Sequence, residues 1–119
     1  MHKILIVDDE PAILMSLDFL MKKEGYNVFI ARDGEEAIEI IKKELPELII
    51  LDIMMPNVDG YEVCNYVKNT EELEHIKVVF LTAKTRKSDI EKGYEIGADD
   101  YVVKPFSTKE LVKRVKQLL

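Results

Sequence analysis

The sequence predicts an α/β fold in which a parallel sheet of five strands is covered by helices on both faces. Five short apolar runs, rich in Ile, Val, Leu and aromatic residues as strands are, recur along the 119 residues. Several of these runs show no polar alternation, which is typical of strands buried on both faces. Segments with helical features separate the runs, and regular alternation of strands and helices favours parallel strands joined by right-handed crossovers.

The apolar runs are the predicted strands, and a predicted helix follows each of them. The strands are expected at Ile4–Val7, Val28–Ala31, Leu48–Leu51, Val78–Leu81 and Tyr101–Val103. The helices are expected at Pro11–Glu24, Glu35–Glu44, Tyr61–Asn69, Ser88–Ile96 and Ser107–Leu119. Since these ten elements occupy the whole chain, we expect one domain over residues 1–119.

The predicted helices carry start and stop signals. Pro11 opens the first helix, where proline is favoured, and Gly25 suits the left-handed residue after its end. The second helix has apolar residues at helical spacing, and the third follows an Asp-Gly turn signal. Gly97 ends the fourth helix, and Ser107 with Glu110 forms a capping box at the start of the fifth.

Composition and charge exclude several classes of protein. Seventeen basic and 23 acidic residues give a formal charge of −6, which argues against direct binding of nucleic acid. Cys64 is the only cysteine, so no intramolecular disulfide can form and a reduced, cytoplasmic setting is expected. There is no apolar run long enough for a membrane span and no signal-peptide core at the N-terminus, so we expect no membrane partner.

Polar side chains follow four of the five predicted strands. Asp8 and Asp9 follow the first strand, Asp52 the third, Thr82 the fourth and Lys104 the fifth. Open α/β sheets bind ligands outside the carboxyl ends of their strands. In the common flavodoxin-like strand order 2-1-3-4-5, the first and third strands are neighbours, so the three carboxylates converge and the other two residues line the same edge.

This set of side chains has the chemistry of a phosphoryl-acceptor site. Crowded carboxylates repel one another unless a cation neutralises them, and an all-oxygen cluster suits Mg²⁺. Lys104 supplies a second positive charge and Thr82 a hydroxyl donor. Asp52 is a carboxylate nucleophile that could form an aspartyl phosphate.

Each of these residues alone also has an ordinary interpretation. An Asp-Asp pair after a strand is commonly a solvated turn, Thr82 suits a strand by propensity, and Lys104 could be a surface lysine. The hypothesis therefore depends on the whole set and on its order along the chain.

Longer motifs around these residues make the sequence recognisable. They are ILIVDDE at 4–10, LIILDIMMPNVDGYEV at 48–63, FLTAK at 80–84, GADDYVVKPF at 97–106 and STKELVKRVKQLL at 107–119. Together they resemble the CheY-like receiver domain of two-component response regulators, and the resemblance covers the whole chain.

The resemblance implies a role for each acidic residue of the set. Asp52 would be the phosphoacceptor. Asp9 and Asp52 would bind Mg²⁺ through their carboxylates, with Asp8 acting largely through water. The backbone carbonyl of Met54 would complete the protein ligands.

The resemblance also implies how the site responds to phosphorylation. Lys104 would pair with the phosphoryl group, and Thr82 would hydrogen-bond to it. Tyr101 resembles the switch aromatic that moves inward when Thr82 moves toward the phosphoryl group, although propensity alone also favours a half-buried strand tyrosine there. The Lys104–Pro105 bond is expected to be cis.

The implied function is a signalling receiver, switched by phosphorylation. A sensor histidine kinase would donate the phosphoryl group from phosphohistidine to Asp52. The receiver would catalyse that transfer and a slow hydrolysis, without being a turnover enzyme. Its output would be a downstream protein or output domain, bound through the face of the fourth helix, fifth strand and fifth helix.

Two surfaces are candidates for partners. On the first helix, Ala12, Ile13 and Ser16 are expected to face the kinase, or else to widen the core contact. The output face is expected to carry charged residues that could support weak homodimerisation on phosphorylation. They are Lys92, Asp99, Asp100, Glu110 and Arg114, while Ile90 stands where a basic residue is usual in the winged-helix regulator group.

Other functions fit the sequence less well. An aspartate-nucleophile phosphohydrolase usually has a second acid two residues after the nucleophile, and here that residue is Met54. Neither a G-x-G-x-x-G nor a G-x-x-x-x-G-K-[ST] motif is present, which disfavours a nucleotide-binding protein. A degenerate receiver used only for docking would not need the complete acidic set with Lys104.

Overall fold

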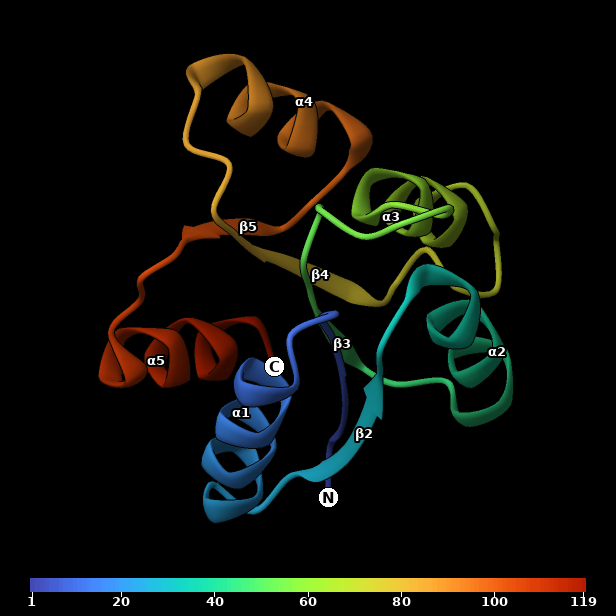
Figure 1. Ribbon diagram of the computed structural model, residues 1–119. Coiled ribbons are helices and arrows are strands. Elements are labelled where there is room, and N and C mark those ends of the chain that lie inside the picture. Colours follow the sequence, from blue (N-terminus) through green and yellow to red (C-terminus); the bar gives the residue numbers. More distant parts are fainter.

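The chain folds into five parallel strands that alternate with five helices (Figure 1). The computed structural model describes all residues from 1 to 119. The strands pair in the order β2-β1-β3-β4-β5, which confirms the predicted flavodoxin-like order. β3 is therefore the central strand, with β1 and β4 on either side of it.

The observed ends of the elements differ from the predicted ends by no more than one residue. The strands are β1 (Lys3–Val7), β2 (Asn27–Ala31), β3 (Leu48–Leu51), β4 (Lys77–Thr82) and β5 (Asp100–Val103). The helices are α1 (Pro11–Lys23), α2 (Gly34–Glu44), α3 (Gly60–Lys68), α4 (Lys87–Ile96) and α5 (Thr108–Leu118).

The predicted helix signals act as caps in the structure. Gly25 and Gly97 have φ angles of 91° and 118°, the left-handed conformation that glycine adopts most easily. The side chain of Ser107 accepts a hydrogen bond from the Glu110 backbone N–H at 3.2 Å. These contacts satisfy backbone groups that the helix itself leaves without partners.

Two apolar layers hold the helices on the sheet. α1 and α5 cover one face through residues such as Leu17 and Val115, and α2, α3 and α4 cover the other (Figure 1). All four residues of β3 are buried, as expected of a central strand covered on both faces. No helix combines the length and the apolar character that a membrane crossing requires.

A close backbone approach fixes the start of α3 beside the end of β3. Asp59 caps α3 by accepting a hydrogen bond from the Glu62 N–H at 2.9 Å. A Cβ atom on the next residue, Gly60, would lie only 2.3 Å from the carbonyl oxygen of Asp52. Because only glycine fits there, the loop between β3 and α3 stays close to the end of the central strand.

Candidate functional site

Asp52 lies at the centre of the carboxyl edge of the sheet. It directly follows β3, and its backbone N–H donates to the Val7 carbonyl of the neighbouring strand at 3.0 Å. Only 4% of the residue is exposed. Burial, together with the charge of Asp8, raises the pKa of the Asp52 carboxyl, although Lys104 and Thr82 oppose the rise. Asp52 is thus a poorly hydrated carboxylate held by the main chain.

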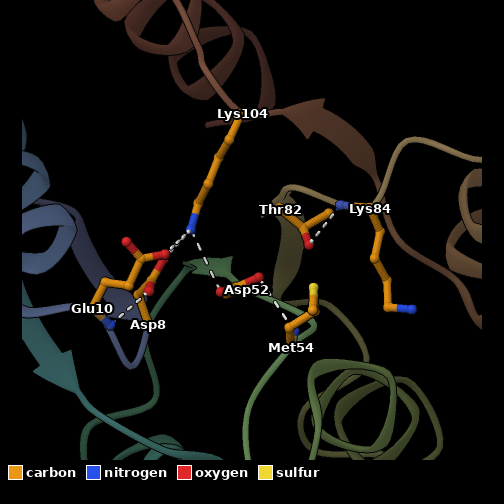
Figure 2. Close-up of polar contacts among 7 residues, drawn as sticks. All are labelled: Asp8, Glu10, Asp52, Met54, Thr82, Lys84 and Lys104. Carbon is orange, nitrogen blue, oxygen red and sulfur yellow. Dashed lines mark hydrogen bonds and ion pairs between the residues drawn. The ribbon is translucent and has the colours of Figure 1, made fainter.

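Lys104 bridges the acidic residues, as Figure 2 shows. Its ammonium lies 2.8 Å from Asp8 Oδ2, 3.5 Å from Asp52 Oδ2 and 3.5 Å from Glu10 Oε1. Burial alone would lower the Lys104 pKa, but the hydrogen bond to Asp8 and the surrounding carboxylates raise it. Lys104 is therefore a permanent cation beside Asp52. The predicted cis bond between Lys104 and Pro105 is confirmed.

Four carboxylates come together at this edge of the sheet. Oxygens of Asp8, Asp9, Glu10 and Asp52 lie within 4.8 Å of one another. The Lys104 ammonium pairs with three of these four carboxyl groups, so the site keeps an excess of negative charge that a hard divalent cation would neutralise. The residues therefore fit Mg²⁺. Glu10 was missed by the sequence analysis; its only signal is that it follows the Asp-Asp pair directly.

Met54 and Thr82 flank Asp52 (Figure 2). The Met54 N–H donates to Asp52 Oδ1 at 3.3 Å, while 55% of the residue remains exposed. Thr82 ends β4, is fully buried and accepts a hydrogen bond from the Lys84 N–H at 3.4 Å. This hydrogen bond ties the loop after β4 to the Thr82 hydroxyl.

Tyr101 points into the protein. Only 7% of it is exposed, and its hydroxyl donates to the Lys84 carbonyl at 2.9 Å. Its ring packs edge-on against Phe80, with 5.9 Å between centroids. Tyr101 and Thr82 therefore contact the same residue of the β4–α4 loop, which brings the two predicted switch residues together.

A second tyrosine, Tyr61, is hydrogen-bonded to the first turn of α4. Tyr61 of α3 donates to the Asp89 carbonyl at 3.0 Å and packs edge-on against Phe80, with centroids 5.7 Å apart. The ammonium of Lys92 lies 4.3 Å from the centre of the Tyr61 ring, a cation–π contact. No pattern in the sequence predicts this role, because it depends on α3 and α4 packing side by side.

Two cavities open at the site and have Asp9 and Met54 in common. One, of about 310 Å³, is lined by residues that include Asp52 and Lys104. The other, of about 540 Å³, lies between the β3–α3 loop and α4 and contains Lys84 and Lys92. The shared residues make the second cavity a neighbour of the first.

The predicted partner surface on α1 is only partly exposed in the structure. On α1, Ala12 and Ser16 are exposed, but Ile13 is half-buried and packs against the core layer under α1 and α5. Met15 and Phe19 are the large apolar side chains exposed on this helix, at 73% and 70%. The half-buried position of Ile13 favours the alternative that it widens the core contact, while Ala12 and Ser16 stay candidates for a partner surface.

The charged residues predicted on the output face of α4, β5 and α5 do not all lie on one surface. Arg114 pairs with Asp100 at 3.0 Å and with Glu110 at 3.2 Å, so these three residues share one face. Asp99 instead accepts hydrogen bonds from Lys68 and from the Val78 N–H. Lys92 faces Tyr61 of α3. The output face thus has fewer free charges than the sequence suggested.

The known proteins that this chain resembles all carry receiver domains or belong to that family. The family model of the response regulator receiver domain matches residues 4–116. The chain is similar to the chemotaxis protein CheY4 of Vibrio cholerae, with 31% identity, a TM-score of 0.93 and coverage of 100% of this chain and 99% of that chain. It is also similar to the receiver domain of a signal transduction histidine kinase from Syntrophus aciditrophicus, with 36% identity, a TM-score of 0.93 and coverage of 100% and 90%. A third similar structure is the BeF3-activated DrrB receiver domain, with 35% identity, a TM-score of 0.91 and coverage of 99% and 97%.

Proposed function

The chain belongs to the family of response regulator receiver domains, and on that premise we propose that residues 1–119 form a receiver that accepts a phosphoryl group on Asp52. Family membership implies signalling that is activated by phosphorylation. One observation carries the choice of residue. Asp52 is a buried carboxylate at the centre of the sheet edge, 3.5 Å from the Lys104 ammonium and inside the acidic cluster.

The proposed reaction is transfer from a phosphohistidine of a sensor histidine kinase. A carboxylate oxygen of Asp52 forms a bond to phosphorus while the bond from phosphorus to the imidazole nitrogen breaks. The electron pair of that bond stays on the nitrogen, and the imidazole leaves. The product is an aspartyl phosphate, which water later hydrolyses slowly, so the domain modifies itself rather than turning over a substrate.

The residues around Asp52 have distinct proposed parts in this transfer. Asp9 and Asp52, the Met54 carbonyl and, through water, Asp8 would hold Mg²⁺. When bound, the ion would supply positive charge to the phosphoryl oxygens. Lys104 supplies a second positive charge there, and it is already held beside Asp52 by Asp8 at 2.8 Å. The Thr82 hydroxyl donates a hydrogen bond to the phosphoryl group.

The proposed switch runs through the β4–α4 loop. Thr82 and Tyr101 both contact Lys84, at 3.4 and 2.9 Å, so a movement of Thr82 toward the phosphoryl group changes the site where Tyr101 is bound. The face of α4, β5 and α5 would then bind a downstream protein, an output domain or, weakly, a second copy. We place the domain in the cytoplasm, and we propose that it binds neither nucleic acid nor a membrane directly.

Replacement of the acceptor tests the proposal. We expect Asp52→Asn to abolish labelling by a histidine kinase or a small phosphodonor, because the amide cannot act as the nucleophile. The matched control is Asp18→Asn, which changes an aspartate on α1 that pairs with Lys22. Mass spectrometry should find one hydroxylamine-labile phosphate per wild-type chain, and none in excess chelator.

Two results would count against the proposal. Undiminished labelling of Asp52→Asn at another peptide would show that the acceptor is elsewhere. Repeated turnover of a general phosphomonoester by the wild-type chain would favour the phosphohydrolase alternative, although Met54 offers no acid at the position where that chemistry places one.

A further inference from the structure

The segment that joins β4 to α4 is held by two tyrosine hydroxyls from different elements. Tyr101 of β5 donates to the Lys84 carbonyl at 2.9 Å, and Tyr61 of α3 donates to the Asp89 carbonyl at 3.0 Å. Lys84 lies in the connection between β4 and α4, whereas Asp89 lies in the first turn of α4. The proposed switch uses the first of these contacts, and the second has no role in it so far.

The two accepting residues and the two tyrosine rings form a closed set of contacts. The Lys84 ammonium lies 3.8 Å from the Asp89 carboxylate, so the accepting residues are paired with each other. Both tyrosine rings pack edge-on against Phe80 of β4, with centroids 5.9 Å away for Tyr101 and 5.7 Å away for Tyr61. The two tyrosines are therefore connected in two ways, through the Phe80 ring and through the start of α4.

The position of α4 and the inward position of Tyr101 depend on each other. A Cβ atom on Gly93 of α4 would lie 3.1 Å from the Tyr101 ring and 3.2 Å from the Phe80 ring, so α4 fits closely over both rings. From the side of α3, Tyr61 contacts α4 through its hydroxyl and through Lys92, whose ammonium lies 4.3 Å from the centre of the ring. α3 thus holds α4 in the position that accommodates the inward Tyr101 ring.

The Tyr61 hydroxyl does something that the ring alone cannot do. Only 7% of the residue is exposed, and the ring by itself supplies the contacts with Phe80 and Lys92. A buried hydroxyl is unfavourable unless it is hydrogen-bonded. Burial raises the pKa of Tyr61, so the hydroxyl stays protonated and remains a donor at neutral pH. The hydroxyl therefore adds one directed bond to the start of α4.

We propose that Tyr61 is a positioning residue of the switch, which braces the start of α4 so that the Lys84 carbonyl can receive the Tyr101 hydroxyl. This inference rests on the proposed function, in which Thr82 and Tyr101 respond to the phosphoryl group. It adds a contribution from α3, which lies outside the face of α4, β5 and α5. Coupling between two sites is reciprocal, so a bond that favours the inward Tyr101 also favours a phosphoryl group on Asp52.

The test is Tyr61→Phe, which removes the hydroxyl and keeps the ring. Tyr66→Phe is the matched control, because this tyrosine lies on the same helix and its ring faces Lys42 of α2, with the ammonium 5.9 Å from the ring centre. The probe is beryllofluoride with Mg²⁺, a mimic of the phosphoryl group. Tyr61→Phe should raise the dissociation constant of the mimic about three- to tenfold, the effect of one net hydrogen bond. Tyr66→Phe should stay within about twofold of wild type.

The Tyr101 ring supplies a second readout. In chains that carry ¹³C-labelled tyrosine, the NMR signal of Tyr101 is identified by its absence from Tyr101→Phe, and it reports how far the ring is buried. Tyr61→Phe should shift this signal toward that of an exposed tyrosine. The loss of mimic affinity caused by Tyr61→Phe should disappear in the Tyr101→Phe background, because Tyr61 acts through the Tyr101 hydroxyl.

Two results would overturn this role of Tyr61. One is a Tyr101 signal and a dissociation constant that are the same in Tyr61→Phe as in Tyr66→Phe. The other is an equal loss of mimic affinity from Tyr61→Phe with and without the Tyr101 hydroxyl, which would indicate a general structural effect. In both cases the mimic still binds the wild-type chain and the proposed function stands. A folded wild-type chain that binds no mimic would contradict the proposed function, and this inference with it.

Discussion

At the scale of single residues, Asp52 is costly to the fold and useful to the site. Its carboxylate is buried at 4% exposure next to Asp8, and one lysine serves several carboxylates around it. Burial raises its pKa, so the charged form is less stable in the folded protein than in the unfolded chain. A carboxylate with little water around it is also a better nucleophile, which connects the cost to the proposed chemistry.

This cost gives a prediction about stability and pH. Because the pKa of Asp52 is raised on folding, the folded state holds that proton more tightly, and the contribution of Asp52 to wild-type stability falls as pH rises above the ordinary aspartate value of about 3.9. Asn has no charge to lose, so Asp52→Asn should be more stable than wild type at neutral pH by about 1 kcal/mol. Urea unfolding from pH 4 to 7 measures the difference.

The difference should be smallest at the acid end of that range. Asp18→Asn serves again as the control, because its carboxylate lies on α1, away from the acidic cluster. A variant that is less stable than wild type at pH 7, or a gap that widens toward acid, would show that the Asp52 charge is favourable in the fold.

At the scale of elements, the site depends on how α3 starts. Asp59 caps the helix, and Gly60 lets its first turn approach the main chain at the end of β3. The same loop carries Met54, which lies in both cavities. The position of α3 therefore controls both the acceptor and the wall of the neighbouring cavity.

Gly60→Ala should disturb both stability and activity. Its Cβ would lie 2.3 Å from the Asp52 carbonyl oxygen, a backbone atom that cannot move without moving the site. We expect a loss of about 2–3 kcal/mol in the free energy of unfolding, and slower labelling of Asp52. Chemical denaturation and labelling by phosphoramidate measure the two effects.

Gly25→Ala is the control that separates the effect of steric crowding, expected in Gly60→Ala, from the effect of losing a glycine backbone conformation. Gly25 has a φ of 91° with no atom within 4 Å of an added Cβ, so its replacement should cost only about 1 kcal/mol and leave labelling unchanged. If Gly60→Ala is no worse than Gly25→Ala, the close approach does not hold the loop in place.

At the scale of the whole molecule, the output face is largely neutralised within one chain. Arg114 bridges Asp100 and Glu110, and Ile90 packs against the core instead of offering a charge. Tyr94, at 47% exposure, adds an apolar contact point. A second copy would have to compete with pairs that already exist, and exposed pairs are individually worth only about 0–1 kcal/mol. Any dimer through this face should therefore be weak.

Dimerisation should depend on the phosphorylated state. Sedimentation with and without beryllofluoride should show a larger dimer fraction with the mimic at about 100 μM, where association is worth about 5.5 kcal/mol. Phosphorylation can shift this equilibrium only as far as the dimer prefers the active conformation. Arg114→Glu should weaken the dimer, and Arg32→Glu, at an exposed residue just after β2, should not.

A chain that stays monomeric in both states would exclude this dimer. The proposed output would then be a different protein bound by the monomer. Equal weakening by both arginine variants would indicate a general effect of net charge rather than a specific face.

The sequence by itself determined the fold and the main members of the site. Alternating apolar runs and helix caps are local signals, and parallel strands place their carboxyl ends at one edge, so Asp8, Asp52, Thr82 and Lys104 could be brought together by reasoning alone. The roles of these residues in phosphoryl transfer remain predictions.

Only the tertiary structure decided which way the helical residues face. Gly93 packs toward the sheet, where a Cβ would lie 3.1 Å from the Tyr101 ring, and this contact turns Lys92 toward Tyr61 and the second cavity instead of the output face. Glu10 joins the acidic cluster because α1 starts beside Lys104. Such contacts depend on how elements distant in sequence pack against one another, and periodicity within one helix carries no information about its neighbour.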